Sequence, residues 1–163
     1  MKQNIQDEFI KSCLQYWDQN LNKITYCLSL LSEEQIWQQP NSVTNSIGNL
    51  ILHLCGNISQ YILGTLGAKN YHRNRNAEFT NNVQFSKTVL LNQLTNIVDE
   101  ARNIAGECTS TKLLKNYSVQ IYEMNGVAIL IHVTEHFSYH VGQIALLTKQ
   151  ITEKDLGFYA SLT

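Results

Sequence analysis

The sequence predicts an all-α fold, a four-helix bundle with one long crossover connection, and three observations favour it. Four long segments repeat apolar side chains three or four positions apart, which is the period of an amphipathic helix. One Asn-rich stretch, residues 68–85, has neither helical nor strand periodicity and is long enough to cross one end of a bundle. The 163 residues, 44% of them hydrophobic, suffice for one buried core but not two, so residues 1–163 form a single predicted domain.

The first predicted helix begins at Ile5 and ends near Leu31. It carries apolar residues along one face throughout. The residues that follow have the form of a capping box, in which the side chains of Ser32 and Gln35 each satisfy an unpaired backbone N–H group. Pro40 then ends any short helix that this box begins.

The second predicted helix begins after Asn45 or Ser46, either of which can serve as its N-cap. It runs to about Leu66, and Gly67 is a plausible C-terminal stop. His53 lies inside this otherwise apolar helix.

The second half of the chain supplies two more helices. Ser86 caps a helix that ends near Gly106, and the last helix runs from about Asn125 to Gln150. Residues 117–122, between them, alternate like a short strand. Because a lone strand has no sheet to join, we expect an extended crossing segment there.

Composition excludes several classes of function. The net charge of −1 supplies no field that would attract nucleic acid or an anionic membrane. No segment approaches the roughly 20 apolar residues of a membrane span. Residues 1–8 lack the apolar core of a secretory signal, so we expect a soluble, cytoplasmic protein. The four cysteines, which lack metal-binding or redox spacing, are predicted to be reduced core thiols: Cys13, Cys27, Cys55 and Cys108.

The last helix contains three histidines at successive spacings of four, His132, His136 and His140. Each neighbouring pair lies on nearly the same helical face, one turn or roughly 6 Å apart, so two imidazoles can meet one ion. The outer two are roughly 12 Å apart along the axis, so geometry leaves either His132 with His136 or His136 with His140.

A third ligand has to come from elsewhere, and the remaining histidines are His53 and His72. We favour His53, because His72 lies in a polar loop beside two arginines and is expected to be solvated. Three imidazoles leave an open coordination position, as in catalytic zinc sites. His132 is then expected to be a structural or ligand-supporting histidine near Glu135.

Two segments carry recognisable motifs. In residues 46–57 a turn of small residues leads into a helix with one histidine, and residues 135–144 contain H-x-x-x-H followed by Gly142 and Gln143. The first segment resembles the second helix of the DinB/YfiT-like metal-binding family, and the second is similar to the final-helix motif of that family. The resemblance implies that His53, His136 and His140 bind one divalent metal ion, with zinc and nickel as the first candidates. It also implies a bundle with a long crossover and a homodimer.

The better-understood members of that family are thiol-dependent enzymes, which suggests S-transferase-like chemistry on a small electrophile with a low-molecular-weight thiol as cosubstrate. An ion-bound thiol loses its proton readily and becomes a nucleophile. Asn57, Tyr139 and Gln143 are candidates to orient this small-molecule substrate or to support the ligands.

Two alternatives stay open. In one, the ion activates water in a hydrolase, although Glu135 should point about 100° away from His136 and is a poor candidate base. In the other, the chain is a non-catalytic metal-binding protein or dimeric scaffold. The residues do not identify the ion, because three imidazoles suit zinc, nickel, copper and iron alike.

Overall fold

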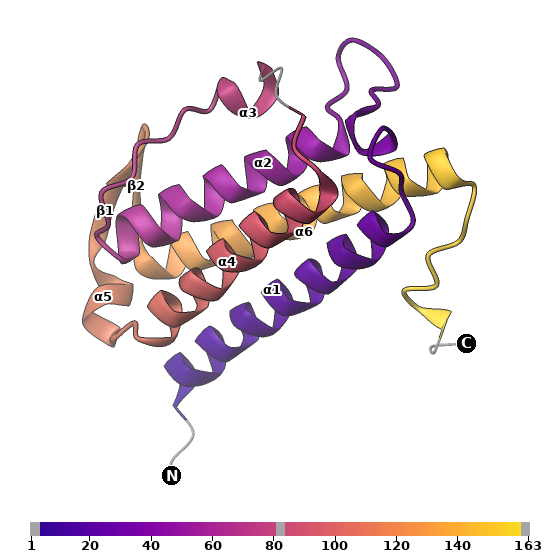
Figure 1. Ribbon diagram of the computed structural model, residues 1–163. Coiled ribbons are helices and arrows are strands. Elements are labelled where there is room, and N and C mark those ends of the chain that lie inside the picture. Colours follow the sequence, from indigo (N-terminus) through magenta and orange to yellow (C-terminus); the bar gives the residue numbers. More distant parts are fainter. Residues whose placement is uncertain (1–3, 81–83, 161–163) are drawn as a thin grey trace.

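The computed structural model describes residues 4–80 and 84–160, which are mostly helical (Figure 1). In chain order the elements are α1 (Ile5–Ser29), η1 (Gln35–Trp37), α2 (Ile47–Ile58), η2 (Ser59–Leu66), α3 (Ala77–Thr80), α4 (Lys87–Gly106), α5 (Ser110–Leu114), β1 (Asn116–Val119), β2 (Tyr122–Asn125) and α6 (Gly126–Thr152). The predicted helical character is therefore confirmed, and the long helices begin and end close to their predicted limits.

The long helices pack side by side around one core. Helix α1 lies against α4 and α6, and α2 with its continuation η2 lies against the same two helices (Figure 1). Their apolar faces meet at side chains that are completely buried, for example Ile24, Ile51, Leu94 and Phe137, each 0% exposed. Burying one such side chain contributes about 1.5–3 kcal/mol, so this shared core holds the helices in place.

Polar side chains begin the helices where the sequence predicted them. The hydroxyls of Ser46 and Ser86 accept the backbone N–H groups three residues on, at the starts of α2 and α4. Asn125 caps α6 in the same way. The predicted capping box also forms, since Ser32 N–H donates to Gln35 Oε1 at 2.8 Å and Gln35 N–H donates to Ser32 Oγ at 3.1 Å.

Helix α2 changes its hydrogen-bonding pattern at Ser59, where the wider π-helical turns of η2 begin. The segment ends at Gly67, as predicted, and Gly67 N–H donates to Ile62 O at 2.8 Å. Gly67 keeps a right-handed backbone, so positive φ is not the reason for a glycine here. The reason is space, because a Cβ atom would lie 2.6 Å from Ile104.

The connection between η2 and α4 returns along the length of α2 (Figure 1). Its first part is irregular, as predicted, but Ala77–Thr80 form the short helix α3, which packs against α2. Glu78 in this turn is buried. The interpretation of residues 68–85 as a loop without structure of its own is therefore wrong at its centre, and residues 81–83 lie outside the described part.

The expected extended segment at residues 117–122 is in fact half of a β-hairpin. Strands β1 and β2 pair antiparallel, with Tyr117 opposite Met124 and Val119 opposite Tyr122. Gln120 turns the chain at φ 57°. The expectation that this strand had no partner is wrong, because residues 122–125 form β2 and pair with it.

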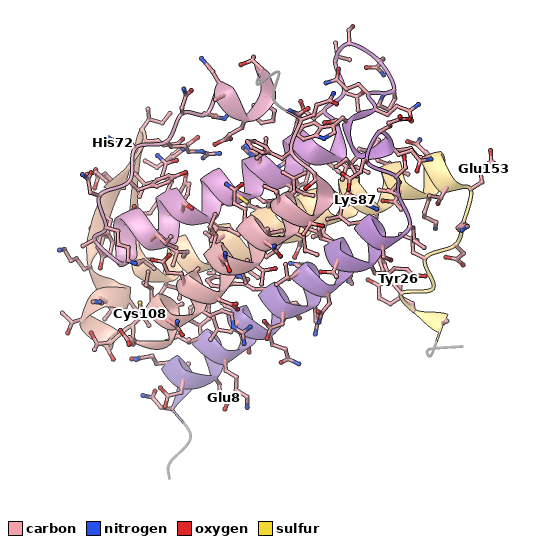
Figure 2. All side chains as sticks on the ribbon, in the orientation of Figure 1. Glu8, Tyr26, His72, Lys87, Cys108 and Glu153 are labelled. Carbon is pink, nitrogen blue, oxygen red and sulfur yellow. The ribbon has the colours of Figure 1, made fainter. Side chains whose placement is uncertain are left out.

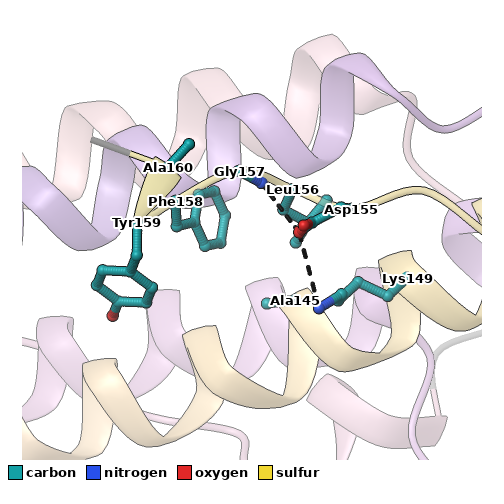
Figure 3. Close-up of a pocket in the computed structure, with 8 residues that line it drawn as sticks. All are labelled: Ala145, Lys149, Asp155, Leu156, Gly157, Phe158, Tyr159 and Ala160. Carbon is teal, nitrogen blue, oxygen red and sulfur yellow. Dashed lines mark hydrogen bonds and ion pairs between the residues drawn. The ribbon is translucent and has the colours of Figure 1, made fainter. Parts of the chain in front are cut away.

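After α6 the chain folds back toward α1. Phe158 packs edge-on against Tyr26, with ring centroids 6.0 Å apart. Asp155 accepts Gly157 N–H at 3.2 Å and lies 3.9 Å from Lys149 Nζ, and this segment lines a groove of about 530 Å³ beside α6 (Figure 3). No histidine lines this groove.

Among the described helices, none has a stretch apolar and long enough to cross a bilayer.

Candidate metal centre

Three histidines from two helices meet between α2 and α6. His53 comes from α2, His136 and His140 come from α6, and one ring nitrogen of each lies within 4.8 Å of the others. The Nε2 atoms of His53 and His136 are 3.0 Å apart. The ring of His140 lies 4.8 Å from that of His53 and 4.5 Å from that of His136, between centroids. The structure thus brings together the three histidines that the family resemblance implied.

Helix α6 is held in the rotation that turns these histidines toward α2. On its opposite side, Trp17 Nε1 donates to Thr134 Oγ1 and Asn20 Nδ2 donates to Ser138 Oγ, both at 2.9 Å. Phe137 is buried in the core between these contacts. Because residues four apart share a face of a helix, His136 and His140 then point together into the same space.

His53 is held by a carboxylate from the long connection. Glu78 Oε2 lies 2.8 Å from His53 Nδ1, and Arg73 donates to both oxygens of Glu78, through Nε at 2.6 Å and Nη2 at 2.8 Å. Arg73 Nη2 is also 3.1 Å from His53 Nδ1. A guanidinium can only donate and a carboxylate only accept, so the shorter contact to Glu78 places the proton on Nδ1. Nε2 of His53 is then left with a lone pair, as a metal ligand requires.

Glu78 is charged in this setting. Burial by itself raises the pKa of the carboxyl group, but hydrogen bonds from His53 and Arg73 and the charge of Arg73 outweigh it and lower the pKa below its ordinary value. The negative charge strengthens the hydrogen bond that holds His53.

His140 is oriented in a similar way from its own helix. Its Nδ1 lies 2.8 Å from Gln143 Oε1, three residues along α6. The amide oxygen accepts, so Nδ1 carries the proton and Nε2 has the free lone pair. Gln143, predicted to support a ligand or face the substrate, therefore holds His140 in this structure.

The electrostatic environment keeps three histidines of α6 unprotonated. Burial, followed by the neighbouring histidines and Arg73, lowers the pKa of His136 to about 3. Burial is also the main cause that lowers the pKa of His140 and of His132. At neutral pH these imidazoles are neutral, which is the form that binds metal.

His132 lies one turn from the cluster and faces other partners. Its Nε2 is 3.4 Å from Asn57 Nδ2, and its ring lies 4.3 Å from that of Tyr61. Asn57 is 4% exposed, and its Oδ1 atom is buried with no hydrogen-bond partner in the described structure. Glu135 instead borders a groove next to α1, on another side of α6. His132 thus contacts Asn57, while the nearby charge of Glu135, as expected from the sequence, acts to raise its pKa against the larger effect of burial.

The two remaining predicted residues lie at the surface. Tyr139 is 58% exposed, and its ring meets that of His140 edge-on with centroids 5.0 Å apart. His72 is exposed on the connection, where Figure 2 shows it at the edge of the molecule. It does not belong to the cluster of three.

The residues present fit a divalent ion. Two nitrogens on a tetrahedral zinc ion with bonds of 2.0–2.1 Å are roughly 3.3 Å apart. The distance of 3.0 Å between the Nε2 atoms of His53 and His136 is close to this value, and one ring nitrogen of each of the three histidines lies within 4.8 Å of the others. The nearby unpaired oxygen of Asn57 is a further acceptor for a group bound there. Three protein ligands leave one position open, which suits exchange of a small molecule.

Sequence reasoning missed Arg73 and Glu78. Both lie in the segment that had no periodicity, and nothing in their spacing relates them to His53. The length of the connection did indicate a functional role for this segment, because long loops in compact domains often contribute to function. Their partnership with His53 arises only when α3 packs on α2.

Comparison with solved structures supports the fold. A DinB-like protein from Bacillus cereus ATCC 10987 superposes with a TM-score of 0.69 at 19% identity, covering 86% of this chain and 91% of its own. The DinB-like protein YjoA from Bacillus subtilis also gives 0.69, at 16% identity, covering 91% and 97%. At such identities the likeness concerns the fold alone. No curated protein matches the chain.

The family itself follows from the sequence model for the whole chain. The model of the DinB family matches residues 1–163, which include both helices of the histidine cluster. The chain belongs to the DinB family.

Proposed function

We propose that this DinB family protein is a divalent-metal-dependent enzyme that transfers a low-molecular-weight thiol to a small electrophile, as S-transferases do. One observation carries the proposal: ring nitrogens of histidines from two helices converge, and the Nδ1 atoms of His53 and His140 are held by acceptors. His53, His136 and His140 would hold the ion, zinc or nickel. When bound, the ion lowers the pKa of a coordinated thiol and so supplies the nucleophile.

The protein's own thiols do not compete for this role. Burial raises the pKa of Cys55 to about 12, assisted by the charge of Glu78. Burial likewise raises the pKa of the other three cysteines, Cys13, Cys27 and Cys108. Because the thiolate is the reactive form, a nucleophilic sulfur has to come from a cosubstrate.

Other residues supply binding and orientation. The unpaired Oδ1 of Asn57 can accept an N–H or O–H group of a bound molecule, which would remove the cost of leaving that atom without a partner. Gln143 keeps the proton of His140 on Nδ1. The exposed Tyr139 lies at the solvent side of His140 and can contact the substrate from there.

Hydrolysis by activated water is less well supported. Glu78 is the carboxylate beside the cluster, but both its oxygens already accept hydrogen bonds from His53 and Arg73. Glu135 is directed to the groove near α1. Glu78 is thus occupied and Glu135 lines a groove on another side of α6, whereas a thiol that loses its proton on binding metal needs no such base.

The proposal includes the remaining expectations about the molecule: a four-helix bundle with one long crossover, a cytoplasmic location and a homodimer. Exposed apolar side chains on α6 support the dimer, namely Ile131, Tyr139 and Leu146 at 53%, 58% and 58%. Light scattering coupled to size-exclusion chromatography measures the dimer directly.

The decisive experiment begins with metal content, measured by elemental mass spectrometry on protein purified without an affinity tag. Near-stoichiometric metal that is lost in His136→Ala supports the site. The metal-loaded protein is then mixed with a chromogenic electrophile and each of several low-molecular-weight thiols. Thiol-dependent conjugation that the variant lacks supports the proposal, and turnover of simple esters without added thiol would overturn it in favour of hydrolysis.

A further inference from the structure

The connection between η2 and α4 places a buried ion pair against the histidine cluster. The side chains of Arg73 and Glu78 are only 5% and 9% exposed, and that of His53 is 7% exposed. Arg73 binds both oxygens of Glu78, so the carboxylate cannot swing away from His53 without losing two further hydrogen bonds. Burying a charged side chain costs free energy unless an opposite charge pairs with it, and Arg73 and Glu78 pair in this way.

The surrounding structure fixes the pair in position. Gln60 Oε1 accepts from Arg73 Nη1 at 3.1 Å and from Gln120 Nε2 of the hairpin turn at 2.7 Å. Asn49 Nδ2 donates to the backbone oxygen of Glu78 at 3.0 Å. Helix α2, the connection and the hairpin therefore all contribute to the orientation of one carboxylate.

Helix α2 leaves room for this carboxylate by carrying a glycine. A Cβ atom at Gly56 would lie 2.0 Å from Glu78 Oε1 and 2.9 Å from Arg73 Nε. Both are atoms of flexible side chains, so an alanine here can be accommodated if the pair moves. The pair occupies the space because residue 56 has no side chain.

We propose that Glu78, held by Arg73, is the positioning residue for His53. It accepts the Nδ1 proton, which selects the tautomer and the ring orientation that direct Nε2 to the ion. The connection that carries Arg73 and Glu78 is thereby part of the metal site, although it contains no ligand. This inference rests on the proposed metal-dependent function. Removal of such a supporting partner typically weakens metal binding 10- to 100-fold.

Two variants remove the contact in different ways. Glu78→Gln takes away the charge that strengthens the hydrogen bond, and Gly56→Ala pushes the unaltered carboxylate out of place. Gly64→Ala is the matched control on the same stretch of helix, because the nearest atom to its added Cβ is Tyr71 Cβ at 3.4 Å. His136→Ala reports on the site itself.

The measurement is the dissociation constant for Co²⁺ by competition with a chelating dye, together with the visible absorption spectrum of the bound cobalt. We expect both test variants to bind Co²⁺ about 10-fold or more weakly than the parent, with an altered ligand-field spectrum, and Gly64→Ala to match the parent. Thermal unfolding of the metal-free forms shows whether each variant folds. If Glu78→Gln does not fold, the Co²⁺ dissociation constant of Gly56→Ala tests the positioning role of Glu78.

A purely structural ion pair gives a different result. Folded test variants would then melt at a lower temperature but keep the parent's affinity for Co²⁺ and its cobalt spectrum. This result would overturn the positioning role of Glu78 and leave the proposed metal site unaffected. Absence of binding by the parent, even after reconstitution, would instead overturn the proposed function and this inference with it.

Discussion

Lowering the pH of the metal-free protein from about 7.5 to about 5.5 tests whether the histidine cluster is as buried as the structure shows. The pKa of His136 in the folded chain is lowered to about 3, mainly by burial. In the unfolded chain an ordinary histidine titrates near about 6.5. Below this pH, His136 binds a proton in the unfolded chain but stays neutral in the folded chain. The stabilising effect of the neutral histidine is complete above about 6.5 and is lost as the pH falls toward about 3.

The size of the effect follows from the width of this pH range. One group contributes at most about 1.4 kcal/mol per pH unit, so the unit below 6.5 sets a ceiling of about 1.4 kcal/mol for His136. Because His136 is partly exposed, solvent screening reduces this to about 0.7 kcal/mol. The pKa values of His132 and His140 are lowered too, mainly by burial, so these two groups change the free energy of unfolding in the same direction. Glu78, with a lowered pKa, loses its contribution only at more acidic pH.

Urea unfolding of the metal-free protein at several pH values, followed by tryptophan fluorescence, measures this loss. His136→Gln should reduce the pH dependence by the contribution of His136, about 0.7 kcal/mol, because glutamine does not titrate. His72→Gln is the matched control, since His72 is exposed on the connection. A free energy of unfolding that stays constant down to pH 5.5, or an equal slope in parent and His136→Gln, would refute the reasoning.

Three further predictions concern metal binding and packing. Zinc at 1,000 times its dissociation constant should stabilise the parent by about 4 kcal/mol, or about 8–16 °C in Tm by differential scanning fluorimetry, and should not stabilise His136→Ala; equal shifts in both would place the metal elsewhere. Phe137→Ala should cost about 3–5 kcal/mol in chemical denaturation, because Phe137 is 0% exposed in the core; a loss below about 1 kcal/mol would contradict this packing. Gly48→Ala should destabilise by about 1–3 kcal/mol, because its Cβ would lie 2.6 Å from the Trp37 ring. Gly142→Ala, whose Cβ meets nothing within 4 Å, should stabilise by about 0.5–1 kcal/mol, and the opposite order would show that the glycines have other roles.

The limits of the long helices were predictable because their causes are local. Ser46 and Ser86 cap helices through bonds to residues three positions on, and the apolar period needs only neighbouring turns. The hairpin was missed for a related reason. Its turn contains Gln120 at positive φ, with none of the Gly, Asn or Asp residues that usually mark such turns.

The candidate site was predictable only in part. The helical period put His136 beside both His132 and His140, but it did not choose between the two pairs. The family resemblance favoured His140. In the structure, α2 and α6 pack so that Asn57 faces His132, while His53 faces His136 and His140.

The sequence by itself determined the helices and the histidines from which the ligands are drawn, since amphipathic periodicity, capping and i, i+4 spacing act within a few residues along the chain. Only the tertiary structure decided which neighbours orient those ligands. Arg73 and Glu78 reach His53 from 20 and 25 positions away, across a connection with no periodic pattern. Such contacts depend on how the connection packs on α2 and on the space left by Gly56, and no local pattern records that packing.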